Sequence, residues 1–313
     1  MTVIANDHKM GPLSANYLQR KDDFVASVTA VGLIAVSITA ATLGAKSHIV
    51  TPSHIASARS IPSAPAAKAP VVTVTGADFT FDAPETIPAG VTEFRFLNKG
   101  PSIHHMQILK LLAGKTFEDL RAALANPGPP PAWIKMLGGP NAPVPGTESN
   151  ATLTLAPGNY AIICFVDLGG PPHFTKGMIR PLKVVPSKVA SVTTPKADIT
   201  TTLFDYNFKL SSHVRAGTHT MRVHNTGPQT HEVELVQLAP GKTAEDFVAW
   251  LGNMKGPPPG KPIGGIAAIE PGMSQLFTAD FAPGNYALVC FIPDSKDGKP
   301  HYAHGMTKQF NVS

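Results

Sequence analysis

The chain has 313 residues, with 26 Lys and Arg against 21 Asp and Glu and a formal net charge of +5. Only 15% of the residues are charged, while 31 Pro and 27 Gly disfavour helical bundles and coiled coils, because both residues are costly inside helices. The basic excess is spread along the chain without a Lys/Arg run, so we expect no nucleic-acid partner. Two cysteines are too few for a disulfide scaffold.

One long apolar segment lies near the N-terminus. Residues 24–45 carry no charge and follow Arg20 and Lys21. A membrane-spanning helix needs about 20 apolar residues, whereas a removable signal has an apolar region of about 7 to 15. We therefore expect residues 1–23 to be a cytoplasmic n-region and 24–45 to be a transmembrane anchor. The alternatives are a signal segment cleaved near residues 56–58, which leaves a secreted protein, and a buried core helix.

The segment at residues 46–70 is rich in Ser, Ala and Pro and has no hydrophobic periodicity. Such a composition is typical of a flexible linker. Either form of export places the chain beyond this segment outside the cytoplasm, in the periplasm or at the cell surface.

The remainder of the chain contains one unit twice. Residues 98–116 match residues 225–243 at a constant offset of 127, and residues 156–161 match residues 282–287 at an offset of 126. Units of this length are duplicated domains, since solenoid repeats have only about 20 to 45 residues. We predict domain one at 71–186, a linker at 187–196 and domain two at 197–313.

Each unit has the periodicity of strands, interrupted by one helix. Residues 93–96 alternate apolar and charged side chains, and residues 160–165 are apolar on both faces, as expected for a central strand. Residues 116–119 and 243–246 each resemble a helix capping box. We therefore predict an all-β fold of two tandem β-sandwiches, each with a short helical insertion.

Four potential metal ligands recur in the same order in both units. They are His104, Cys164, His173 and Met178 in unit one and His231, Cys290, His301 and Met306 in unit two. One thiolate, two imidazoles and a thioether form the donor set of a blue-copper electron-transfer site. The first histidine of each set shares a strand face with apolar residues, so we expect it to point at the core.

These motifs resemble those of the cupredoxin family, the blue copper proteins such as plastocyanin and azurin. The resemblance covers residues 71–313 as two copies and is carried by N-x-G-x3-H and by P-G-N-Y-x3-C followed by P-H-x4-M. The first copy has C-x8-H-x4-M, similar to the type 1 site of copper nitrite reductases, and the second has C-x10-H-x4-M. The resemblance implies Greek-key sandwiches with one type 1 copper per domain, two per chain.

Several of these residues have alternative interpretations. The cysteines could be inert buried thiols or form an interdomain disulfide, the first histidines could be satisfied core residues, and the methionines could only pack. His304 is a rival to His301, although Pro300-His301 matches Pro172-His173. His105 is expected to face away from the core and to be solvated.

Three functions remain open at this stage. The first is an exported, membrane-anchored electron-transfer protein that exchanges electrons with redox partner proteins. The second is a copper oxidoreductase of the nitrite reductase or multicopper oxidase type. Those enzymes have His beside the type 1 Cys, whereas Cys164 lies between Ile163 and Phe165 and Cys290 between Val289 and Phe291. We therefore expect a carrier without catalytic residues, and copper storage or delivery is the third function.

Overall fold

The computed structural model describes residues 68–126, 128–187 and 192–313. The predicted n-region and anchor, and nearly all of the predicted linker at 46–70, lie outside these residues. Within the described ranges, no helix is both long and apolar enough to cross a membrane.

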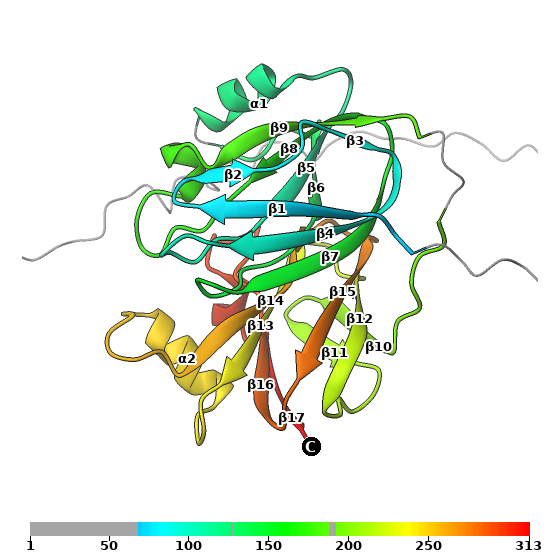
Figure 1. Cartoon of the computed structure of the whole chain (residues 1–313). Helices are drawn as coiled ribbons and strands as arrows, with labels where there is room; N and C mark the ends of the chain where they lie inside the picture. Colours follow the sequence, from blue (N-terminus) through cyan, green and yellow to red (C-terminus); the bar gives the residue numbers. More distant parts are fainter. Residues whose placement is uncertain (1–67, 127, 188–191) are drawn as a thin grey trace, which may run out of the picture. The chain divides into compact units, whose positions relative to one another are not determined.

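The first repeat consists mainly of short strands (Figure 1). In chain order its elements are β1 (Val71–Ala77), β2 (Thr80–Asp82), β3 (Thr86–Pro88), β4 (Gly90–Asn98), β5 (Gln107–Leu111), α1 (Phe117–Leu124), β6 (Ile134–Gly138), β7 (Glu148–Leu155), β8 (Gly158–Ile163), the 3-10 helix η1 (His173–Lys176) and β9 (Ile179–Val185).

The second repeat follows the same order without a counterpart of β3. Its elements are β10 (Ile199–Phe204), β11 (Asn207–Leu210), β12 (Gly217–Asn225), β13 (His231–Leu238), α2 (Ala244–Leu251), β14 (Gly260–Ile269), β15 (Ser274–Phe281), β16 (Gly284–Val289), the 3-10 helix η2 (His301–His304) and β17 (Thr307–Val312). The prediction of an all-β fold with one short helix per repeat is confirmed.

Two sheets contain strands of both repeats. One has the order β11-β10-β12-β15-β7-β4-β1-β2 and the other the order β17-β16-β13-β14-β6-β5-β8-β9-β3. Each sheet passes from one repeat to the other. Thr152 pairs with Leu276 between β7 and β15, and Leu137 pairs with Ile269 between β6 and β14. Further bridges join Pro140 and Pro143, after β6, to Ile266 and Ile263 of β14. Figure 1 shows β7 beside β15 at one of these junctions.

The hydrophobic core of each repeat lies between its two sheets. In the first repeat Phe94 and Phe96 of one sheet pack in the same cluster as Ile108 and Ile162 of the other. Each such side chain, once fully buried, contributes about 1.5–3 kcal/mol of transfer free energy. Cys164 belongs to this cluster, and Cys290 belongs to the matching cluster of the second repeat. The cysteines therefore lie at the end of the core rather than at the surface.

Helix α1 covers the face of the second sheet that points away from the core. Its Leu120 packs in a cluster with Leu109 and Ile163. The preceding residues on the same strands, Ile108 and Ile162, belong to the core cluster on the other face.

The predicted capping box is present, because the Thr116 side chain accepts from the Asp119 N–H and the Asp119 carboxylate accepts from the Thr116 N–H. The same box begins α2. An N-cap of this kind contributes about 1 kcal/mol to stability.

Candidate metal centres

Three of the four predicted ligands of the first repeat converge at one end of its core. His104 precedes β5, Cys164 follows β8 and His173 begins η1. The Nδ1 atoms of the two histidines are 2.9 Å apart, and Cys164 Sγ is 3.6 Å from His173 Nδ1. All three ligand atoms lie within 4.8 Å of one another, and all three residues are buried. The structure thus brings the Nδ1 atoms of two histidines and the Sγ atom of one cysteine together.

The second repeat builds the same group from matching positions. The Nδ1 atoms of His231 and His301 are 3.0 Å apart, and Cys290 Sγ is 4.0 Å from the first and 3.4 Å from the second. His231 is the first residue of β13, and His301 begins η2. Both cysteines lie within the described residues and neither forms a disulfide, so the interdomain disulfide alternative is wrong.

Backbone hydrogen bonds hold the Cys-to-Met loop closed. In the first repeat the Cys164 N–H donates to the Met178 carbonyl, and the Met178 N–H donates to the His173 carbonyl. The second repeat has the same pair of bonds between Cys290, His301 and Met306. Its two additional loop residues are taken up in a turn in which the Asp294 N–H donates to the Lys299 carbonyl and the Gly298 N–H donates to the Asp294 carbonyl. His301 therefore reaches the place of His173 despite the longer spacing.

Both predicted methionine ligands are fully buried beside the cysteines. Met178 belongs to the core cluster of Cys164, and Met306 to that of Cys290. Each follows a glycine that ends the 3-10 helix in the left-handed conformation, Gly177 with φ 107° and Gly305 with φ 92°. A left-handed residue at this place favours glycine, because other residues pay a steric cost there. The glycine thus turns the chain so that the methionine enters the core.

The rival ligand His304 lies outside the second group. Its Nε2 is 3.1 Å from an Asp297 carboxylate oxygen, and its side chain is partly exposed. Together with Asp294 these residues form a further group of closely spaced side chains. The Asp294 carboxylate already accepts from the Tyr206 hydroxyl and from Gln229 Nε2, so it braces the loop beside His301.

Sequence reasoning missed a carboxylate behind the first histidine of each group. Nε2 of His104 is hydrogen-bonded to Asp78, and Nε2 of His231 is 2.7 Å from an Asp205 oxygen. A carboxylate accepts, so Nε2 carries the proton and Nδ1 presents its lone pair to the group. Asp78 and Asp205 are separated by the same offset of 127 as the histidines. A search for every polar pair at this offset would have found them.

The arrangement passes a simple test of fit for a metal ion. Metal–nitrogen bonds of about 2.0–2.1 Å and metal–sulfur bonds of about 2.3 Å place two nitrogens about 3.3–3.6 Å apart and a nitrogen and a sulfur about 3.5–3.8 Å apart around one ion. The observed separations are 2.9 and 3.0 Å between nitrogens, and 3.4 to 4.0 Å for three of the four pairs of nitrogen and sulfur. The fourth pair, Cys164 Sγ and His104 Nδ1, lies within 4.8 Å. The groups therefore need to move by about an ångström or less to hold an ion.

Burial sets the protonation of these ligands. It raises the pKa of Cys164 to about 12 and that of Cys290 well above its usual range. Burial also lowers the pKa of His104 and His231, against the opposing effect of their carboxylates, and lowers that of His301 to about 4. At neutral pH the metal-free protein therefore has neutral imidazoles and protonated thiols. A metal ion must displace the thiol proton when it binds.

The expectation that His105 is solvated is wrong. Its side chain is buried, and its Nε2 accepts a hydrogen bond from the Phe165 N–H at 2.9 Å. In the second repeat the buried Glu232 has this role, because its Oε1 accepts from the Phe291 N–H at 3.0 Å. Burial lowers the pKa of His105 to about 4 and raises that of Glu232 to about 7. Each side chain therefore holds the residue after a ligand cysteine.

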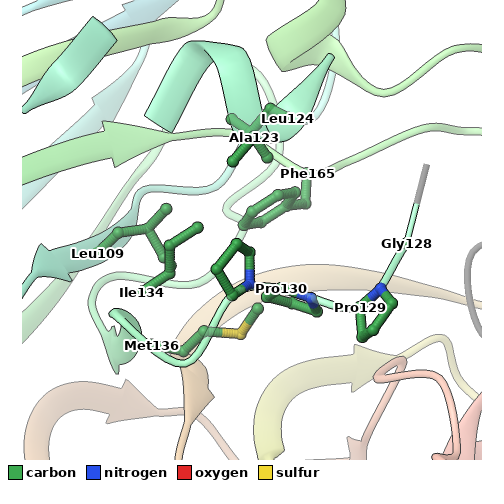
Figure 2. A pocket seen from close by; sticks show the side chains of 10 residues that line it. Leu109, Ala123, Leu124, Gly128, Pro129, Pro130, Ile134, Met136 and Phe165 are labelled. Atoms are coloured by element: carbon green, nitrogen blue, oxygen red, sulfur yellow. The ribbon is translucent and has the colours of Figure 1, made fainter. Parts of the chain in front are cut away.

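A small apolar pocket lies under α1 in the first repeat. Figure 2 shows Leu109, Ile134 and Met136 on one side and Ala123 and Leu124 of α1 on another, with Phe165 and Pro130 between them. None of its lining side chains can act as an acid, a base or a hard metal ligand. The pocket therefore offers no chemistry of its own.

Comparisons with known proteins find similarity among solved structures alone. No protein-family model matches the chain, and no curated protein matches it. Reduced auracyanin from Roseiflexus castenholzii is 20% identical, covers 38% of this chain and 99% of its own, and has a TM-score of 0.27. Two proteins from Nitrosomonas europaea each cover 79% of this chain. The blue copper oxidase is 15% identical, is covered over 86% of its own length and has a TM-score of 0.25. The copper nitrite reductase is 14% identical, is covered over 94% of its own length and has a TM-score of 0.24.

TM-scores this low carry no argument about this chain. The architecture itself is seen directly in the two shared sheets and in the matching order of elements. The chain therefore contains the same arrangement of strands twice, with a buried His-Cys-His group at the same place in each copy.

Proposed function

We propose that the chain is an electron-transfer protein that holds one copper ion in each repeat. The observation that carries the proposal is the duplicated, fully buried group of two Nδ1 atoms and one Sγ, with a buried methionine in the same core cluster. A thiolate and a thioether are soft ligands that suit Cu(I), and imidazole suits both oxidation states. When bound, copper would supply the one-electron couple between Cu(II) and Cu(I).

The residues around each group fit a carrier. Asp78 and Asp205 orient the first histidine, and backbone hydrogen bonds fix the loop that carries the other ligands. A group held this firmly changes little in geometry when its charge changes, which favours fast electron transfer. The methionines Met178 and Met306 would supply weak thioether ligands. The residues that flank each cysteine are apolar, so no neighbouring histidine connects the thiolate to another metal centre along the chain.

Spectroelectrochemistry on the copper-loaded full chain in detergent tests the proposal. An intense visible thiolate-to-copper band should bleach on reduction and return on oxidation over many cycles. A band that does not return, or copper that leaves on reduction and passes to a copper acceptor, would instead identify a storage or delivery protein. Copper above two per chain together with consumption of nitrite or oxygen would identify an oxidoreductase.

We further propose that the protein is exported and anchored in a membrane by residues 24–45, with redox proteins as its partners. The proposal is supported by the uncharged 22-residue segment after Arg20 and Lys21. Extraction of the membrane fraction with alkaline carbonate tests it. A retained anchor stays with the membrane, whereas a cleaved chain appears in the soluble fraction with a shortened N-terminus.

A further inference from the structure

Three buried side chains connect the residue after Cys164 with the residue after Cys290. The Phe165 N–H donates to His105 Nε2 at 2.9 Å, and, against the larger effect of burial, the neighbouring side chain of Asn141 raises the pKa of His105. Asn141 Nδ2 donates to Glu232 Oε2 at 3.4 Å, and the Phe291 N–H donates to Glu232 Oε1 at 3.0 Å. The three side chains therefore lie one after another between the two repeats.

The direction of each hydrogen bond follows from the donors available. His105 Nε2 accepts from a backbone N–H, so its proton is on Nδ1 and that atom donates. The Asn141 side chain raises the pKa of His105, which is the effect of an acceptor oxygen near that ring, and its NH2 group donates to the carboxylate of Glu232. An amide is the group needed at this position, because it must accept on one side and donate on the other.

Asn141 is held in place by both repeats. Its backbone N–H donates to the Gly265 carbonyl at 3.1 Å, and its Nδ2 also donates to the Val233 carbonyl at 3.1 Å. The Ser149 hydroxyl donates to the Asn141 carbonyl at 2.6 Å. His105, Asn141 and Glu232 are 8%, 2% and 5% exposed, so the path is shielded from water along its whole length.

We propose that His105, Asn141 and Glu232 form the route by which an electron moves between the two centres. This inference rests on the proposed function of both centres. In the step, Cu(I) at one centre is oxidised to Cu(II) while Cu(II) at the other is reduced to Cu(I), and no proton or ligand is transferred. Coupling through bonds and hydrogen bonds decays less steeply than coupling across an empty gap, so a row of buried, closely placed polar side chains favours this exchange. Asn141 acts as a positioning residue that closes the path between the repeats.

The competing explanation is that these side chains only fasten the repeats together. A matched control exists in Asn150, whose Nδ2 donates to the Thr278 carbonyl at 2.7 Å and whose Oδ1 accepts from the Thr278 N–H at 2.8 Å. Asn150 also joins the repeats by two amide hydrogen bonds, but it contacts none of the three residues of the path. Both Asn141→Leu and Asn150→Leu remove amide hydrogen bonds between the repeats, buried ones in the first case and exposed ones in the second, and only the first breaks the path.

The test is flash reduction of the copper-loaded full chain. A light flash generates the methyl viologen radical, which gives one electron to one copper centre and becomes the methyl viologen dication. A Met306→Gln background gives the two centres different spectra and potentials, because the axial ligand tunes both. We expect a second absorbance phase whose rate is independent of protein concentration. Asn141→Leu should slow this phase by an order of magnitude or more at unchanged potentials, whereas Asn150→Leu should leave it as it is.

A second readout does not depend on copper. In metal-free protein labelled with 15N, Asn141→Leu should shift the backbone amide resonances of both Phe165 and Phe291, and Asn150→Leu should shift neither. If Asn141→Leu does not fold, Asn141→Ala, which leaves room for water, takes its place in both measurements. A purely structural role of Asn141 would lower the thermal midpoint of its variants and leave the second phase unchanged.

The outcomes separate this inference from the proposed function. If the parent chain has two reversible blue centres but shows no concentration-independent phase, or if the Asn141 variants keep its rate, the path is wrong and the carrier function stands. If the parent chain forms no reversible copper centre, the proposed function itself is wrong.

Discussion

Nε2 of His104 is hydrogen-bonded to the carboxylate of Asp78, and this bond turns the Nδ1 lone pair of His104 toward His173 and Cys164. The second repeat has the same relationship between His231 and Asp205. A ligand histidine that donates its other ring N–H to a carboxylate is fixed in tautomer and orientation and becomes more basic. Each centre is thus preorganised from the first sheet, by a residue that follows β1 or β10.

We predict that Asp78→Ala weakens copper binding at the first centre about 10–100-fold, because an outer carboxylate of this kind contributes that much to metal affinity. Competition titration against a chelator in a Cys290→Ser background, where only the first centre remains, measures the change. Asp82→Ala removes an exposed carboxylate of the same repeat and serves as the control. Equal affinities for the Asp78 and Asp82 variants would contradict this role.

Metal binding should release a proton from the cysteine of each centre. Burial raises the pKa of Cys164 to about 12, whereas burial keeps the histidine pKa values low. With one proton displaced per site, affinity should fall about tenfold for each pH unit between pH 8 and pH 6. Calorimetric titration in buffers of different ionisation enthalpy measures the released protons. An affinity that does not change over this range would show that the thiol is already ionised.

Two buried glutamates should make the metal-free protein less stable as the pH rises. Burial, and then the charge of Glu232, raises the pKa of Glu234 well above its ordinary 4.5. The folded state therefore holds this proton more tightly than the unfolded chain does. Its contribution is fully present below about pH 4.5 and is lost as the pH rises through the folded pKa. Glu232, with a pKa raised to about 7, acts in the same direction.

The matching experiment measures the free energy of unfolding of the metal-free protein by urea at pH 5 and at pH 8. Buried histidines with a lowered pKa, among them His105 and His301, act in the opposite direction, so the comparison is between proteins that share them. We expect the parent to lose stability relative to Glu234→Gln from pH 5 to pH 8. Glu118→Gln, an exposed change on α1, should follow the parent. A difference between the parent and Glu234→Gln that stays constant over this range would be inconsistent with the raised pKa of Glu234.

Gly265 should be intolerant of a side chain, because it lies where the repeats meet. It has φ +124°, and a Cβ there would collide with the Val233 carbonyl oxygen. Gly265→Ala should therefore cost about 3 kcal/mol or more in the free energy of unfolding. Gly272 also has a positive φ of +79° but has nothing near its Cβ position, so Gly272→Ala should cost only about 1–2 kcal/mol. Similar losses for both variants in urea unfolding would show that Gly265 has more room than the structure indicates.

The sequence predicted the parts of the fold that depend on local patterns. The alternating strands and both capping boxes are present, because each depends on residues a few positions apart. The duplication is visible because the same local motifs recur at an offset of 126 or 127 residues. The bridges between β7 and β15 and between β6 and β14 depend on how the repeats meet, and no local pattern encodes this. The same limit explains His105, whose place on a strand pattern suggested solvent but which another part of the fold covers.

The ligand positions show a similar division. The order His, Cys, His, Met in both repeats identified the residues that converge as Nδ1, Nδ1 and Sγ, and the match of Pro300-His301 with Pro172-His173 preferred His301 over His304. Asp78 and Asp205 were missed because each lies 26 residues before its histidine, on a different strand. A hydrogen bond between distant segments becomes visible only when the sheets are assembled.

The most direct test of the central claim is the copper content and visible spectrum of three proteins: the full chain, Cys164→Ser and Cys290→Ser. The account predicts two copper ions per chain with an intense thiolate-to-copper band, and one ion with about half the band in each single variant. A full chain that stays colourless with copper, or a single variant that keeps both the full copper content and the full band, would contradict it.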